Sequence, residues 1–295
     1  MPSIPVPVRS ALGALVLAIV AGACGSEPAP PVLVLGGIPD QDHALLEERF
    51  GRIADALSER LGVEARYAPA GDYAALVTAF EHGDVQLVWF GGLTGVQARR
   101  VVPGARAVVQ RPRDAEFRSV FITRADREAG TLAELAGASF TFGSDNSTSG
   151  HLMPRHFLAA SGVDPEHDFT AVNYSGSHDA TWQLVEDGIW DAGVLNEAVW
   201  ERAVREARVD TARVRVVQVT EPYFDYHWVA HPALEERFGE GTTERVIAAF
   251  LSLAEDPDEA DLLRMFETDS FIETTDANYA AIEAVAASLG MLGEG

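Results

Sequence analysis

The sequence predicts an α/β protein with two lobes, each built on a mostly parallel sheet flanked by helices. Short β-branched runs alternate with segments of helical periodicity through most of the 295 residues. A second series of alternating strands and helices begins near residue 122, and a long extended segment at 213–224 returns the chain to the first lobe. Because parallel strands need long crossover connections, two such series joined by two extended crossings imply two sheets with a cleft between them.

The first series follows a proline-rich stretch. Apolar β-branched runs predict strands at 31–39, 63–69, 85–92, 105–113 and 117–126. Helical spacing of apolar residues predicts helices at 42–62, 72–84 and 93–102. Asp72 is the expected N-cap of the second helix, and Gly62 and Gly83 stand just past helix ends.

The second series also alternates strands and helices. We predict strands at 138–144, 169–177 and 213–224, and a strand followed by a helix within 190–207. Helices are expected at 131–137, 150–162, 178–188, 242–254, 257–267 and 276–289. Lobe 1 is therefore assigned to residues 32–122 with 224–295, and lobe 2 to residues 123–223.

The first 24 residues have the pattern of a bacterial lipoprotein signal. Arg9 gives a positive end, residues 12–20 form a short apolar run, and small residues 21–23 precede Cys24. Cys24 is the only cysteine, so we expect it to be the lipidation site, with residues 25–31 as a tether. The protein would then be exported and anchored to the cell membrane. Plain secretion remains an alternative, because the usual leucine three residues before the cysteine is replaced by alanine.

Composition excludes several function classes. The net charge of −23 disfavours binding of nucleic acid over a broad face. All 22 basic residues are arginine, so a phosphate-loop lysine, a Schiff base and a lysine general base are absent. The histidines are scattered without metal-ligand spacing, and we expect neither a metal nor a cofactor.

A cluster of hydroxyl side chains marks the candidate site. Ser147, Thr148 and Ser149 end a loop after a strand and open a helix at Gly150. The first amides of a helix lack internal partners and carry partial positive charge, so with these hydroxyls they suit a tetrahedral oxyanion. Ordinary N-capping is the alternative. His178 also opens a helix, where it could donate to an anion or serve in capping and packing.

Four segments, at 72–92, 140–158, 173–181 and 191–201, resemble the substrate-binding proteins of phosphate, phosphite and phosphonate ABC importers. Within that group the likeness is greatest to a branch labelled as putative selenate importers, and it covers nearly all of 31–290. The resemblance implies a type II periplasmic-binding-protein fold with two hinge crossings. It also implies a non-enzymatic role: capture of a small oxyanion and delivery to a membrane permease with its ATPase subunit.

The resemblance also implies roles for single residues. Ser147 and Thr148 would grip the anion oxygens, with Ser149 beside them and His178 as a further donor. Tyr73 and an aromatic side chain at Phe90 would line the cleft. Since Phe90 lacks the hydroxyl found in many binders of aminophosphonates, a smaller ligand is favoured.

Two acidic residues lie where the resembled aminophosphonate binders hold the ligand's amine. These residues are Glu197 and Asp225. An acid in an anion site is sensible when the bound species carries a proton or an amine, whereas an unprotonated dianion is repelled. A surface position is the alternative for either acid in a chain with 45 of them.

The sequence leaves alternatives open both for the identity of the ligand and for the class of protein. The sequence does not rank phosphonate, phosphite and phosphate, and selenate or sulfate would suit the same role. An exported phosphoester hydrolase using Ser147, His178 and Asp179 is the alternative from another class. Adjacent His and Asp side chains at a helix start point apart, which argues against a catalytic relay.

Overall fold

The computed structural model describes residues 1–3 and 30–292. The chain divides into a first unit of residues 1–30 and a second unit of residues 31–295. Cys24, almost all of the predicted signal segment and most of the tether lie outside the described residues. Among the helices that are described, none is long and apolar enough to cross a membrane.

The second unit contains a six-stranded sheet in the order β11-β4-β10-β3-β1-β2. Its strands are β1 (Leu33–Gly37), β2 (Ala65–Tyr67), β3 (Leu87–Phe90), β4 (Arg106–Gln110), β10 (His227–Ala230) and β11 (Ile272–Glu273). Strand β1 pairs in parallel with β2 and β3, whereas β10 is antiparallel to β3 and β4. We call this sheet and the helices that pack on it the six-stranded half.

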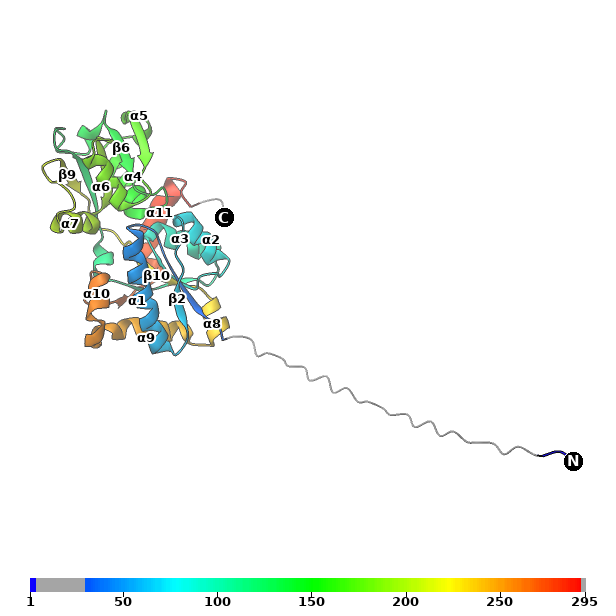
Figure 1. Cartoon of the computed structure of the whole chain (residues 1–295). Coiled ribbons are helices and arrows are strands. Elements are labelled where there is room, and N and C mark those ends of the chain that lie inside the picture. The colour runs from blue at the N-terminus through cyan, green and yellow to red at the C-terminus, as the bar shows by residue number, and fades with distance from the viewer. Residues whose placement is uncertain (4–29, 293–295) are drawn as a thin grey trace. The chain divides into compact units, whose positions relative to one another are not determined.

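A five-stranded sheet in the order β7-β6-β8-β5-β9 forms the other half (Figure 1). Its strands are β5 (Ser119–Arg124), β6 (Ser139–Phe142), β7 (Ala171–Tyr174), β8 (Ala192–Asn196) and β9 (Val214–Val219). Strand β6 pairs in parallel with β7 and β8, and β5 is antiparallel to β8 and β9. Both sheets are therefore mixed, because β5 and β10, which follow the two crossings, run against their neighbours.

Helices flank both sheets, as the alternating sequence pattern predicts. They are α1 (His43–Leu61), α2 (Tyr73–Glu81), α3 (Gly92–Val101), α4 (Met153–Ala160), α5 (Pro165–Asp168), α6 (His178–Glu186), α7 (Glu197–Arg205), α8 (Ala233–Phe238), α9 (Thr242–Ser252), α10 (Ala260–Met265) and α11 (Ala280–Ser288). The side chain of Asp72 accepts from the amide of Ala75, and Gly62 ends α1 at a φ of 67°. These two helix boundaries are confirmed.

Two extended segments join the halves and lie side by side. Phe117 and Tyr223 exchange backbone hydrogen bonds of 2.8 and 2.9 Å. The predicted lobe boundary at residue 122 falls within β5, all of which pairs in the five-stranded sheet. The division into residues 32–122 with 224–295 and residues 123–223 stays a prediction.

Candidate functional site

Helix starts from both halves meet between the two sheets. The amide of Leu93, at the start of α3, donates to Thr148 Oγ1 over 2.9 Å. Thr148 opens a short helical turn, η3 (Thr148–Leu152), that runs into α4 in the five-stranded half. The preceding amide, of Gly92, donates to Asp225 Oδ1 over 2.8 Å. The hydroxyl cluster and Asp225, far apart in the sequence, are thus brought to the same helix start.

The three hydroxyl residues are buried at this junction. Ser147, Thr148 and Ser149 are each 2% exposed or less. Ser147 Oγ accepts from the amide of Gly150 over 2.9 Å, which is the N-capping role that the sequence left open. Within the described part of the chain, the amides of Thr148 and Ser149 have no hydrogen-bond partner. Their N–H groups therefore remain available for acceptor oxygens, and the hydroxyl of Thr148 lies beside the carboxyl group of Asp225.

Asp225 is fully enclosed at the same place. Its Oδ1 accepts from Gly92, while among the described residues Oδ2 finds no partner. Burial is the largest influence and raises the pKa of Asp225 to about 7, although the Gly92 amide and the nearby hydroxyls of Thr148 and Ser149 oppose this. The carboxyl group is therefore poised to share a proton near neutral pH.

Tyr73 lies at the start of α2 and is also buried. Its hydroxyl has no hydrogen-bond partner of normal geometry in the described chain, although Ser147 lies near it. Burial, followed by the charges of Asp40 and Asp225, raises the pKa of Tyr73 well above its usual value of 10. The phenol is therefore neutral and brings an unpaired hydroxyl to the part of the cluster that holds Asp40 and Asp225.

His178 begins α6 and is 1% exposed. Burial lowers the pKa of His178 more than Asp40 and Asp179 raise it, so the ring is neutral at pH 7. The Asn196 amide lies 3.4 Å from Nδ1, which makes Nδ1 the acceptor and leaves the proton on Nε2. His178 is thus a neutral N–H donor, held to the other half by its backbone amide, which donates to Asp40 O over 3.1 Å.

Two residues that the sequence did not indicate also belong to this cluster. Tyr226 Oη donates to Asp40 Oδ2 over 2.6 Å and lies 3.4 Å from His178 Nε2. Asp40 follows the carboxyl end of β1, and such strand ends face the opposite half. This position in the sequence could have indicated Asp40 as a site residue. No sequence pattern indicated Tyr226, because its position in the cluster is set by the path of the extended segment before β10.

Strand β3 places its two aromatic residues on opposite faces. Phe90 packs edge-on against Phe80 with ring centres 5.5 Å apart and is completely buried. Trp89 stacks on Tyr226 at 5.6 Å with an interplanar angle of 13°. Trp89 therefore supports the polar cluster through Tyr226, while Phe90 lies in the core of the six-stranded half; its predicted ligand contact stays untested.

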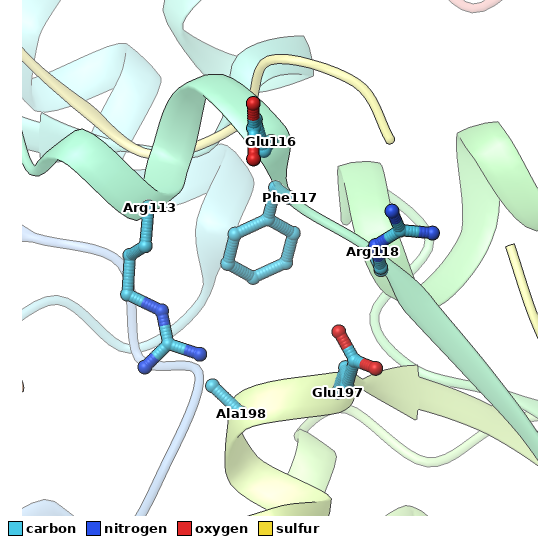
Figure 2. A pocket seen from close by; sticks show the side chains of 6 residues that line it. All are labelled: Arg113, Glu116, Phe117, Arg118, Glu197 and Ala198. Carbon is cyan, nitrogen blue, oxygen red and sulfur yellow. The ribbon is translucent and has the colours of Figure 1, made fainter. Parts of the chain in front are cut away.

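Glu197 lies apart from the hydroxyl cluster, in a surface pocket of about 140 Å³ near the crossings. Figure 2 shows the Phe117 ring pointing into this pocket between Arg113 and the facing side chains of Arg118 and Glu197. Partial burial and Glu201 raise the pKa of Glu197. The Phe117 ring packs on Tyr226 at 5.2 Å, so an aromatic layer separates the pocket from the buried cluster.

Glycines permit the close approach of the two halves at the cluster. A Cβ atom on Gly91 would lie 3.1 Å from Thr148 Oγ1 and 3.2 Å from Asp225 Oδ1. The hydroxyl and the carboxylate would then have to move away from the amides of α3. The glycine pair after β3 is therefore part of the site's construction.

The residues of the alternative hydrolase do not form a relay. Ser147 Oγ caps Gly150, while Asp179 accepts from Trp182 Nε1 over 3.2 Å and pairs with Arg208 over 3.1 Å. His178 turns instead to Asn196 and Tyr226. In the described ranges, no group of three or more His, Cys, Asp or Glu residues could hold a metal ion.

Comparison with known proteins decides the family. The family model described as "ABC transporter, phosphonate, periplasmic substrate-binding protein" matches residues 35–279. The chain belongs to this family. It is 41% identical to the "Probable ABC transporter phosphite binding protein PhnD1" of Prochlorococcus marinus (strain MIT 9301), over 89% of this chain and 91% of that protein. The predicted class, a substrate-binding protein of an ABC importer, is confirmed.

Solved structures confirm the predicted type II periplasmic-binding-protein fold. The structure of PhnD1 from Prochlorococcus marinus (MIT 9301) in complex with methylphosphonate has a TM-score of 0.85 and covers 88% of this chain and 98% of its own. A binding protein component of an ABC phosphonate transporter from Pseudomonas aeruginosa has a TM-score of 0.79 at 18% identity, covering 89% of this chain and 88% of its own. The second likeness concerns the fold alone.

Proposed function

We propose that this family member binds a small tetrahedral phosphorus oxyanion, phosphite or a short phosphonate such as methylphosphonate, with phosphate as a related candidate. The observation that carries the proposal is the enclosed set of unpaired groups at the helix starts. The amides of Thr148 and Ser149, Tyr73 Oη and Asp225 Oδ2 have no partner in the part of the chain that is described. Buried polar groups are normally paired, so a polar ligand accounts for them.

The chemistry of these groups matches an oxyanion that can share a proton. Neutral donors come from the amides, and on binding also from the Thr148 hydroxyl and from His178, whose N–H otherwise faces Tyr226. No arginine is needed to hold the charge. Asp225, with a pKa of about 7, either donates a proton to a ligand oxygen or accepts one from it. A dianion that carries no proton meets repulsion whenever Asp225 is charged, which favours phosphite and phosphonates over sulfate and selenate.

The surroundings favour a compact ligand. Tyr226 and Phe117 close the cluster toward the pocket that holds Glu197, as their ring contact shows. A phosphonate with a long substituent would have to displace these aromatic rings. The relative PhnD1, whose solved complex contains methylphosphonate, is consistent with a ligand of this size.

The remaining parts of the proposed role concern partners and location. The protein would deliver its ligand to an ABC permease with its ATPase subunit and act without catalysis. A lipid on Cys24 would hold it at the membrane, facing the periplasm or the exterior. Mass spectrometry of the membrane-extracted protein and of a Cys24→Ser variant tests the anchor: lipidation supports it, and an unmodified, released chain contradicts it.

Calorimetric titration against phosphite, methylphosphonate, phosphate, aminoethylphosphonate, selenate and sulfate tests the ligand. We expect one site per chain, with phosphite or methylphosphonate binding most tightly. Preference for selenate or sulfate would instead support the importer role with another oxyanion. Incubation with phosphoesters should release no phosphate, and turnover would place the protein among hydrolases.

A further inference from the structure

A polar contact between the halves lies outside the candidate ligand site, on α7. Arg202 Nη1 is 3.1 Å from Glu267 Oε1, and Arg202 Nη2 donates to Gln41 Oε1. Helix α7 follows β8 of the five-stranded sheet. Gln41 follows β1, and Glu267 follows α10, which packs on α1 in the six-stranded half. One guanidinium group therefore holds two segments of the opposite half at once.

The backbone of Glu267 has a conformation that is unfavourable for a residue other than glycine. Glu267 has a φ of 54°, in the left-handed region that favours glycine at the end of a helix. Hydrogen bonds from Glu267 N to Arg264 O and from Thr268 N to Leu263 O close α10 there. A glutamate at this position costs conformational energy, yet its carboxylate reaches both Arg202 and Arg113, with Arg113 Nη1 at 3.4 Å from Oε2.

The contact is linked in sequence to the candidate site. Gln41 adjoins Asp40, whose carbonyl accepts from the amide of His178 and whose carboxylate accepts from Tyr226. A rigid-body opening of the two halves that separates His178 from Asp40 therefore also separates Arg202 from Gln41. Because Arg202 is only 8% exposed, its ion pair is screened little by solvent in this arrangement.

We propose that Arg202, with Glu267 and Gln41, is an interlobe latch that raises the affinity for the oxyanion without touching it. Hinge opening between the halves breaks these contacts, so they add their free energy only to the closed form that encloses the ligand. The inference rests on the proposed oxyanion function. Arg202 is a positioning residue: it holds α7 and the neighbouring start of α6 against the loop that carries Asp40.

The test compares Arg202→Met with the unchanged chain. Methionine keeps the apolar stem and removes the guanidinium group. We expect the dissociation constant for methylphosphonate to rise about 5- to 50-fold, mainly through faster dissociation in stopped-flow measurements. Arg60→Met is the matched control, because Arg60 pairs with Asp256 and Glu259 within the six-stranded half. That variant should bind as the unchanged chain does.

Glu267→Gly separates a latch from a merely structural contact. Glycine relieves the left-handed conformation and so offsets part of the lost ion pair; we expect the urea midpoint to fall no further than in Arg202→Met, while methylphosphonate dissociates faster in both variants. Unchanged affinity in both Arg202→Met and Glu267→Gly would overturn the latch while leaving the ligand proposal intact. If the unchanged chain binds no oxyanion, the proposed function fails. The latch is then judged by small-angle scattering, where Arg202→Met should enlarge the ligand-free chain and an equal radius of gyration refutes it.

Discussion

The backbone amide of Leu93 donates a 2.9 Å hydrogen bond to the hydroxyl oxygen of Thr148, and this bond joins the two halves of the candidate site. The acceptor role occupies the oxygen of Thr148 and leaves its proton for another partner. The first amides of α3 are taken by Asp225 and Thr148, and the unpaired amides of Thr148 and Ser149 lie beside them. In the proposed function, these helix starts let a strongly acidic chain hold an anion without a basic surface.

Thr148→Ala should weaken binding of methylphosphonate by about 1–3 kcal/mol, because a buried donor to the anion is lost and the Leu93 amide loses its acceptor. Isothermal titration calorimetry provides the dissociation constant. Thr170→Ala, at an exposed position in the same half, is the control and should bind normally. Equal affinities in Thr148→Ala and the control would remove Thr148 from the site.

Asp225→Asn should flatten the pH dependence of binding. One proton shared between Asp225 and the ligand is needed, so affinity of the unchanged chain should fall by up to about tenfold per pH unit above pH 7. Measuring both chains with the same ligand at each pH from 5 to 9 cancels the ligand's own ionisation. A parallel pH dependence in the two chains would show that Asp225 does not share the proton.

The same carboxyl group affects stability in the ligand-free protein. The pKa of Asp225 is about 7 in the folded chain and 3.8 as the ordinary value, so the folded state binds more protons between these pH values. Its contribution to stability is therefore present below pH 4 and lost as the pH rises to 7. Urea unfolding should show Asp225→Asn gaining stability relative to the unchanged chain over this window; a constant difference would contradict the raised pKa.

His151 should make the protein sensitive to acid. Burial, with Arg155 adding to it, lowers the pKa of His151 from 6.5 to about 4, although the carbonyl of Asp145 opposes this. The unfolded chain then binds the extra proton first, and stability is lost as the pH falls from 6.5 toward 4. His151→Phe should reduce this loss by up to about 1.4 kcal/mol per unit of pKa shift. Chemical denaturation at pH 7 and pH 5 measures the difference, and an unaltered loss in the variant would contradict it.

Gly95→Ala should destabilise the fold by about 1–3 kcal/mol, because the added Cβ would lie 2.3 Å from the buried ring of His227. Gly51→Ala is a matched control in α1, where nothing lies within 4 Å of an added Cβ. That change should stabilise the chain by about 0.5–1 kcal/mol through better helix propensity. Thermal unfolding of the two variants should therefore shift in opposite directions, and a shift in the same direction would contradict the close packing of α3 on β10.

Strand and helix patterns along the sequence predicted most of the fold. Long amphipathic segments such as α1 and capped starts such as Asp72 carry local signals that tertiary packing does not override. Strand β10 was not predicted as a strand. Its four residues are buried on both faces, so they show no alternation, and the preceding residues 221–226 look like a crossing.

The candidate site was only partly predictable for a related reason. Four site residues were predicted because each lies at or beside a helix start, where polar side chains meet unpaired amides. They are Ser147, Thr148, Ser149 and His178. Asp40 and Tyr226 are 186 positions apart in the sequence and are joined by a hydrogen bond. No local sequence pattern predicts a contact of this kind. Glu197 begins α7, within the segment where a helix was predicted, and its side chain faces the pocket beside Phe117 because of how the crossings pack.

A crystal structure of the chain with phosphite or methylphosphonate tests the central claim most directly. We predict that the anion's oxygens lie within hydrogen-bond distance of the amides of Thr148 and Ser149 and of the carboxyl group of Asp225. An anion held elsewhere, for example between Arg118 and Glu197, with the helix starts still unpaired, would contradict the account.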